Sequence, residues 1–151
     1  MADQGSKLWA LHVLDGGRVV PVLGEWLQLR LLFNAGAAFS IGSSLTSVMT
    51  AVSLVVTVVI AFMLRRLGSR PWAVAFGLLL GGSVGNLVDR FARDPGPLRG
   101  HVVDFIDYGG LFVGNVADIA IVLAAVLLVW LVQTDTRIDG RRPRHTAEKE
   151  V

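Results

Sequence analysis

Long stretches without a charged side chain constrain this chain more than any other feature of its sequence. No charged residue occurs between Arg30 and Arg65, and that gap contains the apolar segment 45–64. A bilayer core about 30 Å thick requires roughly 20 apolar residues, so this segment is long enough to cross it. Two further uncharged runs predict membrane spans at 71–89 and at 115–133.

The composition agrees with a membrane protein. Of the 151 residues, 53% are hydrophobic and 17% are charged, whereas a soluble domain carries about 25% charged residues. The alternative is three buried helices in a soluble core, but a domain of this size has too little mass to surround them. High hydrophobicity excludes a disordered chain. The absence of cysteine excludes disulfides, thiolate metal sites and a cysteine nucleophile. We therefore predict one mainly α-helical membrane domain over residues 1–151.

Lysine and arginine residues predict its orientation. The link after the first span and the tail 134–151 are rich in basic residues, namely Arg65, Arg66, Arg70, Arg137, Arg141, Arg142, Arg144 and Lys149. Because positive residues favour the cytoplasmic side, we expect the link and the tail there, and segments 1–44 and 90–114 outside. A solvated cytoplasmic tail explains the basic residues better than a nucleic-acid-binding arm does.

The N-terminal region predicts a small outward β-sheet rather than a membrane helix. Asp15-Gly-Gly reads as a turn between short strands, and 25–30 alternates polar and apolar residues as a half-buried strand does. We expect a β-sheet element over roughly 10–34. Residues 1–7 have neither the basic start nor the apolar stretch of a signal peptide.

The second span combines a glycine face with two polar residues. Gly77, Gly81 and Gly85 recur every four residues, which places them on one face and allows a neighbouring helix to approach closely. Asn86 and Arg90 share a side near the outer end. In the ordinary interpretation Asn86 bonds a neighbouring helix and Arg90 anchors to lipid headgroups.

Three acidic residues at the outer membrane boundary carry the functional hypothesis: Asp89, Asp104 and Asp118. Ionisable groups at membrane depth are costly and indicate function. Asp118 could instead be an ordinary first-turn acid of a helix, and Asp104 a solvated loop acid. In a functional site, two close carboxylates share one proton, so that one activates water while the other polarises a peptide carbonyl. The histidines are scattered, which makes a zinc site improbable.

Five short blocks, in order along the chain, resemble bacterial lipoprotein signal peptidase (signal peptidase II). They are DQGSK (3–7), NAGAAFS (34–40), GGSVGNLVDR (81–90), HVVDFI (101–106) and NVAD (115–118). The stretch PGPLRGH (95–101) is similar to actinobacterial members. The resemblance implies an aspartyl endopeptidase that removes the signal peptide from a prolipoprotein, cleaving just before a cysteine that carries diacylglyceryl.

Matching the motifs assigns roles to individual residues. Asp104 and Asp118 match the catalytic pair, and Asp89 matches a structural acid that pairs with Arg90 or a backbone group. The positions expected around the substrate pocket are Asp3, Asn34, Gly81, Asn86, Arg90 and Asn115. The family fold implies a four-helix membrane bundle, an outward β-cradle and an amphipathic helix within 97–106. No metal or other cofactor is implied.

The resemblance also predicts the setting. We expect a multi-pass, monomeric protein of the bacterial plasma (inner) membrane, with its active site near the outer face and its C-terminus cytoplasmic. Its partners would be membrane lipid and prolipoproteins lipidated by an upstream diacylglyceryl transferase, and not nucleic acid. The rival hypothesis is a small transporter or channel subunit that uses Asp118 and Arg90 as an ion site and in which Asp104 is dispensable.

Two departures from the family pattern lead to further expectations. The family has a span before the DQGSK block, so we expect an apolar segment of roughly 20 residues upstream of Met1, lost through a truncated or misassigned start. Gly114 stands where the family usually has an aromatic residue, and we expect looser packing beside Asp118.

Overall fold

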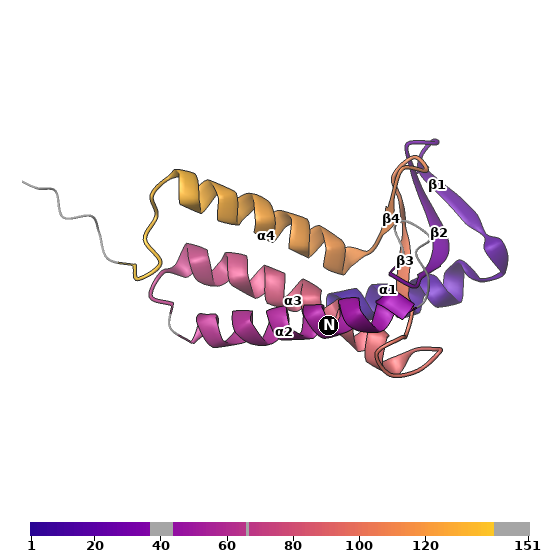
Figure 1. The fold of residues 1–151 in the computed structure, drawn as a ribbon. Coiled ribbons are helices and arrows are strands. Elements are labelled where there is room, and N and C mark those ends of the chain that lie inside the picture. The colour runs from indigo at the N-terminus through magenta and orange to yellow at the C-terminus, as the bar shows by residue number, and fades with distance from the viewer. Residues whose placement is uncertain (37–43, 66, 141–151) are drawn as a thin grey trace, which may run out of the picture.

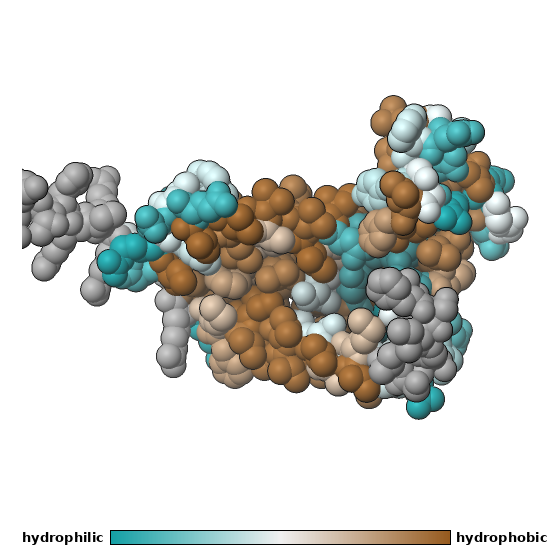
Figure 2. Space-filling model, turned by 45° about the horizontal axis from the view of Figure 1, so that its top comes forward, coloured by the Kyte–Doolittle hydropathy of each residue, from teal (hydrophilic) through white to brown (hydrophobic). Residues whose placement is uncertain are grey.

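Three long helices form the body of the protein. The computed structural model describes residues 1–36, 44–65 and 67–140. Helices α2 (Ser44–Leu64), α3 (Arg70–Ala92) and α4 (Val116–Gln133) run alongside one another (Figure 1). Each is long and apolar enough to cross a membrane, and their outer surface forms an apolar belt between two polar ends (Figure 2). The three predicted spans are confirmed, and α3 continues three residues beyond the expected end at 89.

Helices α3 and α4 approach closely at Gly82 and at Gly85, of which only Gly85 belongs to the predicted face. A Cβ atom added at Gly82 would lie 2.6 Å from the carbonyl oxygen of Ala117 in α4. At Gly77 and Gly81 an added Cβ would meet nothing within 4 Å, and both residues are exposed. The predicted glycine face is therefore wrong at these two positions, since the contact uses Gly82 and Gly85. The four-residue spacing located a stripe of small residues but not the side on which α4 packs.

A four-stranded antiparallel sheet covers one end of the bundle (Figure 1). Its strands are β1 (Val19–Leu23), β2 (Leu27–Asn34), β3 (Val102–Asp107) and β4 (Val113–Gly114), in that spatial order. The predicted sheet element over 10–34 is confirmed from Val19 onward. The stretch from residue 10 to Val13 belongs to a helix, α1 (Ala2–Val13), which is followed by a short 3₁₀ turn at Asp15–Gly17.

Helix α1 forms because its buried positions follow a helical period. Asp3, Lys7, Ala10 and Leu14 are spaced four, three and four residues apart, and all four are buried. Ala10 and Leu14 pack against Phe105 of β3. The sequence reading relied on the turn at Asp15 and overlooked this spacing, so the prediction of a strand before the turn was wrong.

The expected amphipathic helix within 97–106 is also absent from that stretch. Residues 97–99 form a turn, and β3 begins at Val102. The β-branched pair Val102 and Val103 starts a strand buried on both faces, which lies between β2 and β4. Asp104 is therefore part of a central strand and not of a surface loop.

The opposite end of the bundle is closed by the segment after α4. The indole Nε1 of Trp72 donates a hydrogen bond of 2.8 Å to the carbonyl oxygen of Thr136. The backbone N–H groups of Gly68 and Ser69 donate to the carbonyl oxygen of Ile138. The last part of the predicted cytoplasmic tail, residues 141–151, lies outside the described residues, as do Arg66 and residues 37–40 of the second motif block.

Candidate active site

Asp104 lies on β3 at the junction between the sheet and the helices. Its carboxylate is almost fully buried, with 1% of the residue exposed. The Asn34 side chain on the neighbouring strand β2 donates a hydrogen bond of 2.9 Å to Oδ2, and Asn115 donates one of 2.6 Å to Oδ1. Both oxygens are thus held by amide groups, and the orientation of the carboxylate is fixed.

Asp118 lies in the first turn of α4. It forms a reciprocal capping box with Asn115: the Asp118 N–H donates to Asn115 Oδ1, and the Asn115 N–H donates to Asp118 Oδ2, both at 3.1 Å. Asn86 of α3 donates a further hydrogen bond of 2.9 Å to Asp118 Oδ1. The interpretation as a first-turn acid is therefore correct for Asp118. This capping role leaves its carboxylate at the wall of a cavity.

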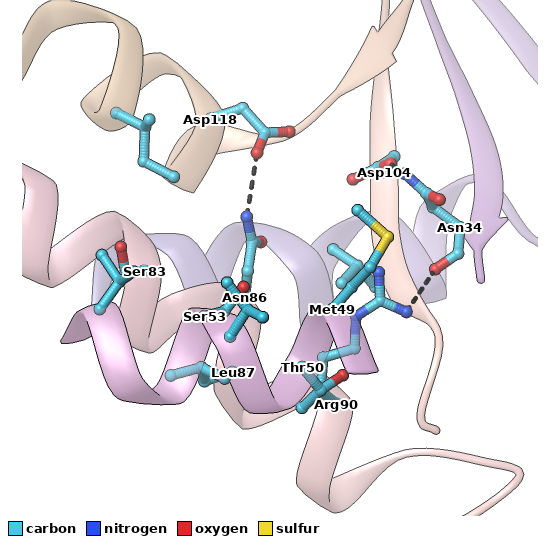
Figure 3. A pocket seen from close by; sticks show the side chains of 14 residues that line it. Asn34, Met49, Thr50, Ser53, Ser83, Asn86, Leu87, Arg90, Asp104 and Asp118 are labelled. Atoms are coloured by element: carbon cyan, nitrogen blue, oxygen red, sulfur yellow. Dashed lines mark hydrogen bonds between the residues drawn. The ribbon is translucent and has the colours of Figure 1, made fainter. Parts of the chain in front are cut away.

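Two asparagines connect the carboxylates. Asn115 contacts Asp104 through its side chain and Asp118 through its backbone and side chain, and its Nδ2 also donates to Asn86 Oδ1 at 3.2 Å. Figure 3 shows Asp104 and Asp118 reaching one cavity from β3 and from α4, with Asn86 rising from α3 to Asp118. The two acids, which we call the dyad, thus share a framework of amide donors.

The dyad faces a cavity of about 300 Å³ between α2, α3, α4 and the sheet. Apolar side chains form one part of its wall, and hydroxyl, amide and guanidinium groups the other. The sequence reading missed the contribution of α2, which supplies Thr50 and Ser53. A usable signal existed, because Thr46, Thr50, Ser53 and Thr57 recur at helical spacing within an otherwise apolar span.

Burial dominates the electrostatics of Asp104. Removal from water raises the pKa of its carboxyl group to about 6, although the hydrogen bonds from Asn34 and Asn115 act in the opposite direction. The negative charge of Asp118 adds to the rise. Among the described residues, no lysine, arginine or histidine forms an ion pair with either member of the dyad. This environment favours a pair that holds one proton.

Arg90 supports the wall of the cavity rather than the dyad itself. Its Nη1 donates to the carbonyl oxygens of Asn34 at 3.2 Å and of Gly100 at 3.1 Å, which ties the end of β2 to the loop before β3 (Figure 3). Gly36 has a φ of +92°, and an added Cβ would lie 2.9 Å from Arg90 Nη2. A glycine is needed there for both reasons.

Two residues expected around the pocket do not line it. Gly81 is exposed on α3. Asp3 accepts a hydrogen bond of 2.9 Å from the Ala117 N–H at the start of α4 and forms an ion pair of 2.9 Å with Lys7. Asp3 therefore joins α1 to α4 beside the site. Of the six expected positions, Asn34, Asn86 and Arg90 line the cavity, and Asn115 binds both catalytic candidates.

Asp89 is a structural acid that bonds a backbone group as expected, but its ion pairs are with cations other than Arg90. It forms ion pairs with Lys7 at 2.8 Å and with Arg93 at 2.7 Å, and it accepts a hydrogen bond from the Val103 N–H. In the described part of the chain, Arg90 forms no ion pair or hydrogen bond with it and bonds the carbonyl oxygens of Asn34 and Gly100 instead. Lys7 was missed as a functional position, although Asp3 and Lys7 at i and i+4 signalled a helical ion pair. Lys7 also donates to Asn86 Oδ1 at 3.0 Å.

The predicted loosening at Gly114 is wrong, because an aromatic ring reaches this place from elsewhere. A Cβ atom added to Gly114 would lie 2.6 Å from Cε1 of Phe112 and 3.0 Å from Oδ2 of Asp118. The glycine therefore lets the Phe112 ring pack over the backbone beside Asp118. In the described part of the chain, no group of three or more His, Cys, Asp or Glu residues is arranged to hold a metal ion.

Comparison with known proteins identifies the family. The fold resembles a bacterial membrane enzyme solved by the in meso method at 2.3 Å resolution, with a TM-score of 0.76 and 26% identity over 99% of this chain and 87% of that chain. The chain is accordingly an integral membrane protein built like a membrane enzyme. The family model described as signal peptidase (SPase) II matches residues 1–134, and the chain belongs to this family.

Curated relatives agree with this assignment. The lipoprotein signal peptidase of Mycobacterium avium is 50% identical over 129 residues, which cover 85% of this chain and 71% of that protein. The lipoprotein signal peptidase of Mycolicibacterium smegmatis is 47% identical over 150 residues, which cover 97% of this chain and 63% of that protein. The chain thus spans about two thirds of the length of these actinobacterial relatives.

Proposed function

We propose that this protein is an aspartyl endopeptidase that removes the signal peptide from diacylglyceryl-modified prolipoproteins, cleaving before the lipidated cysteine. The observation that carries the proposal is the dyad: Asp104 and Asp118 face one cavity, are held by amides and form no ion pair with a described cation. The names of the relatives support the substrate class. The proposed roles are catalysis for the dyad and substrate positioning for Asn34, Asn86, Arg90 and Asn115.

The dyad supports hydrolysis without a covalent intermediate. The ionised carboxylate takes a proton from water, and the water oxygen attacks the carbonyl carbon of the scissile peptide bond. The protonated carboxyl group gives its proton to the carbonyl oxygen at the same time. When the tetrahedral intermediate collapses, the C–N bond breaks and the leaving nitrogen takes the proton that the first carboxylate acquired. One hydroxyl group of the intermediate returns its proton to the other carboxylate, which restores the singly protonated pair. The asparagine framework keeps both carboxylates in position during these steps.

The proposed setting is the bacterial plasma membrane, with the sheet and the dyad on the outer side. The end of α2, the start of α3 and the end of α4 lie away from the sheet (Figure 1). Arg65 directly follows α2, Arg70 begins α3 and Arg137 follows α4, so the positive-inside rule favours the cytoplasm for that end. The partners would be membrane lipid and prolipoproteins that a diacylglyceryl transferase has already modified. We propose that the protein acts as a monomer and binds no nucleic acid.

A cleavage assay in lipid bilayers tests the proposal. A diacylglyceryl prolipoprotein should be cleaved before its modified cysteine by the wild-type protein, and neither Asp104→Asn nor Asp118→Asn should cleave it while both accumulate in the membrane. The unlipidated precursor should be cleaved more slowly. If Asp104→Asn processed the substrate at the wild-type rate, the dyad assignment would be wrong and the transporter hypothesis, in which Asp104 is dispensable, would be favoured.

A further inference from the structure

A second cavity adjoins Asp118 and is not used by the mechanism described above. It measures about 400 Å³ and is lined by Tyr108, Phe112, Asp118, Ile119, Val122 and Leu123. Asp118 also lines the first cavity. On α4, Ile121 follows Asp118 on the side of the first cavity, whereas Ile119, Val122 and Leu123 lie on the other side. The two cavities therefore meet at one carboxylate of the dyad. We call the second one the Phe112 groove.

Aromatic side chains at the tip of the β3–β4 hairpin build one wall of this groove. The rings of Tyr108 and Phe112 stack with centroids 6.1 Å apart and planes inclined by 19°. The Phe112 ring occupies the space above Gly114, where a Cβ atom would collide with it. A residue larger than glycine at this position would push Phe112 away from Asp118. Gly114 and Phe112 together thus place the wall directly beside the proposed catalytic carboxylate.

The Phe112 groove opens on the outer surface of the bundle. Phe112 is 53% exposed, Val122 is 61% exposed and Leu123 is 54% exposed. Val122 and Leu123 belong to a helix that is long and apolar enough to cross a membrane, and only 17% of its most apolar window is buried. This side of α4 is apolar and open at the surface of the described residues, which gives a hydrocarbon chain a sideways path into the groove.

The two cavities differ in polarity, so they suit different parts of a lipidated peptide substrate. A peptide segment around a scissile bond is not helical, and in a membrane its N–H and C=O groups need hydrogen-bond partners. The first cavity offers them through Asn34, Ser83 and Arg90 among others. The Phe112 groove has only the Asp118 carboxylate and the Tyr108 hydroxyl among hydrocarbon and aromatic side chains. It therefore suits an acyl chain and not a peptide backbone.

We propose that the Phe112 groove holds an acyl chain of the substrate's diacylglyceryl group, while the first cavity holds the peptide. This inference rests on the proposed function. The lipidated cysteine follows the scissile bond directly. Its acyl chains therefore begin only a few covalent bonds from the scissile bond, and the scissile bond lies beside Asp118 in the proposed complex. The adjoining position of the groove and its opening at the outer surface match this requirement.

A substitution that fills the groove should affect substrates with long acyl chains and spare those with short ones. Val122→Phe should raise the KM for a dipalmitoylglyceryl prolipoprotein about tenfold, since an added ring competes with several methylene groups. The KM for a dibutyrylglyceryl analogue of the same peptide should stay unchanged. Val129→Phe is the matched control, because Val129 is 57% exposed on α4 but does not line the groove. It should leave both KM values unchanged.

Other outcomes overturn the inference while leaving the proposed function intact. If Val122→Phe changed neither KM, or if its effect followed the length of the signal peptide rather than that of the acyl chain, the groove would not hold the lipid. If the wild-type protein cleaved neither substrate, the proposed function itself would fail.

Photo-crosslinking gives a readout independent of turnover. A prolipoprotein with diazirine-terminated acyl chains, bound to the Asp104→Asn variant, should label the segments 108–112 and 119–123. Labelling confined to Met49, Val52 and Val56 of the first cavity would overturn the proposal.

Discussion

Two pairs of acidic residues lie close together at the sheet end of the bundle, and their surroundings differ. Asp3 and Asp89 are neutralised by Lys7 and, in the case of Asp89, also by Arg93. We call these four residues the Asp89 cluster. Asp104 and Asp118 are held by asparagine side chains and by the N–H of Asn115, and they form no ion pair with a described cation. Lys7 links the two groups through its hydrogen bond to Asn86.

The difference explains why similar residues serve different purposes. A buried carboxylate that is paired with a buried ammonium stays ionised, and removal of either partner leaves an uncompensated charge. A buried carboxylate with only amide partners can gain or lose a proton, which is what acid–base catalysis needs. The Asp89 cluster therefore holds α1, α3 and the sheet together, and the dyad remains free to react.

The largest expected effect separates activity from stability. Asp104→Asn should lower kcat/KM by roughly 10²–10⁴-fold because it removes a proton-transferring group. Its apparent Tm in detergent should fall by less than that of Asp89→Asn, since the amide is uncharged and matches the carboxylate in shape, although its NH2 group faces one of the donors from Asn34 and Asn115. Asp89→Asn should do the reverse and lower the Tm while the folded fraction remains active. A comparable loss of kcat/KM in folded Asp89→Asn protein would remove the distinction between the two groups.

Lys7→Met should destabilise the protein by about 3–5 kcal/mol, because it leaves Asp3 and Asp89 buried without their shared cation. The measurement is equilibrium unfolding in mixed micelles. Arg137→Met is the control, since its ion pair with Asp139 is exposed and should be worth less than about 1 kcal/mol. Equal effects of the two substitutions would contradict the structural role of the Asp89 cluster.

Asn115 both caps α4 and donates a hydrogen bond to Asp104, and two substitutions separate these roles. Asn115→Ala removes the cap of α4, which costs about 1 kcal/mol of stability. It also removes the hydrogen bond to Asp104, and we expect kcat to fall roughly 10–100-fold, in line with a lost bond to a charged group. Asn115→Ser keeps a good capping residue, so it should restore the Tm without restoring kcat. If Asn115→Ser restored kcat, the effect of Asn115 on kcat would come from capping α4 and not from its hydrogen bond to Asp104.

The smallest expected effect is a shift of the pH profile. The singly protonated dyad is lost when pH rises through the raised pKa of Asp104, about 6, so kcat/KM should decline above that pH. Asn34 donates to Asp104 and lowers this pKa. Asn34→Ala should therefore move the decline to higher pH, by less than about one unit. A shift to lower pH would contradict the assigned role of the hydrogen bond.

Local patterns predicted the elements that depend on local chemistry. The uncharged runs located α2, α3 and α4 because each span must be apolar along its own length. The alternation at 25–30 located β2 for a similar reason. The prediction of a strand before Asp15 was wrong because a short apolar stretch fits the period of a strand as well as that of a helix. Packing against Phe105 selects the helix. The glycine contact failed likewise, since the position of α4 decides which glycine is close.

The sequence alone determined that this is a membrane chain with a few acids at its boundary, and the motif resemblance selected Asp104 and Asp118 among them. Which of these acids are neutralised depends on how the helices and the sheet pack. Lys7 reaches Asp89 because α1 packs on α3, and Asp104 meets Asn115 because β3 pairs with β4, which leads directly into α4. Hydrophobic periodicity predicts an element because it depends only on the residues of one segment. The environment of a buried charge depends instead on segments that are far apart in the chain.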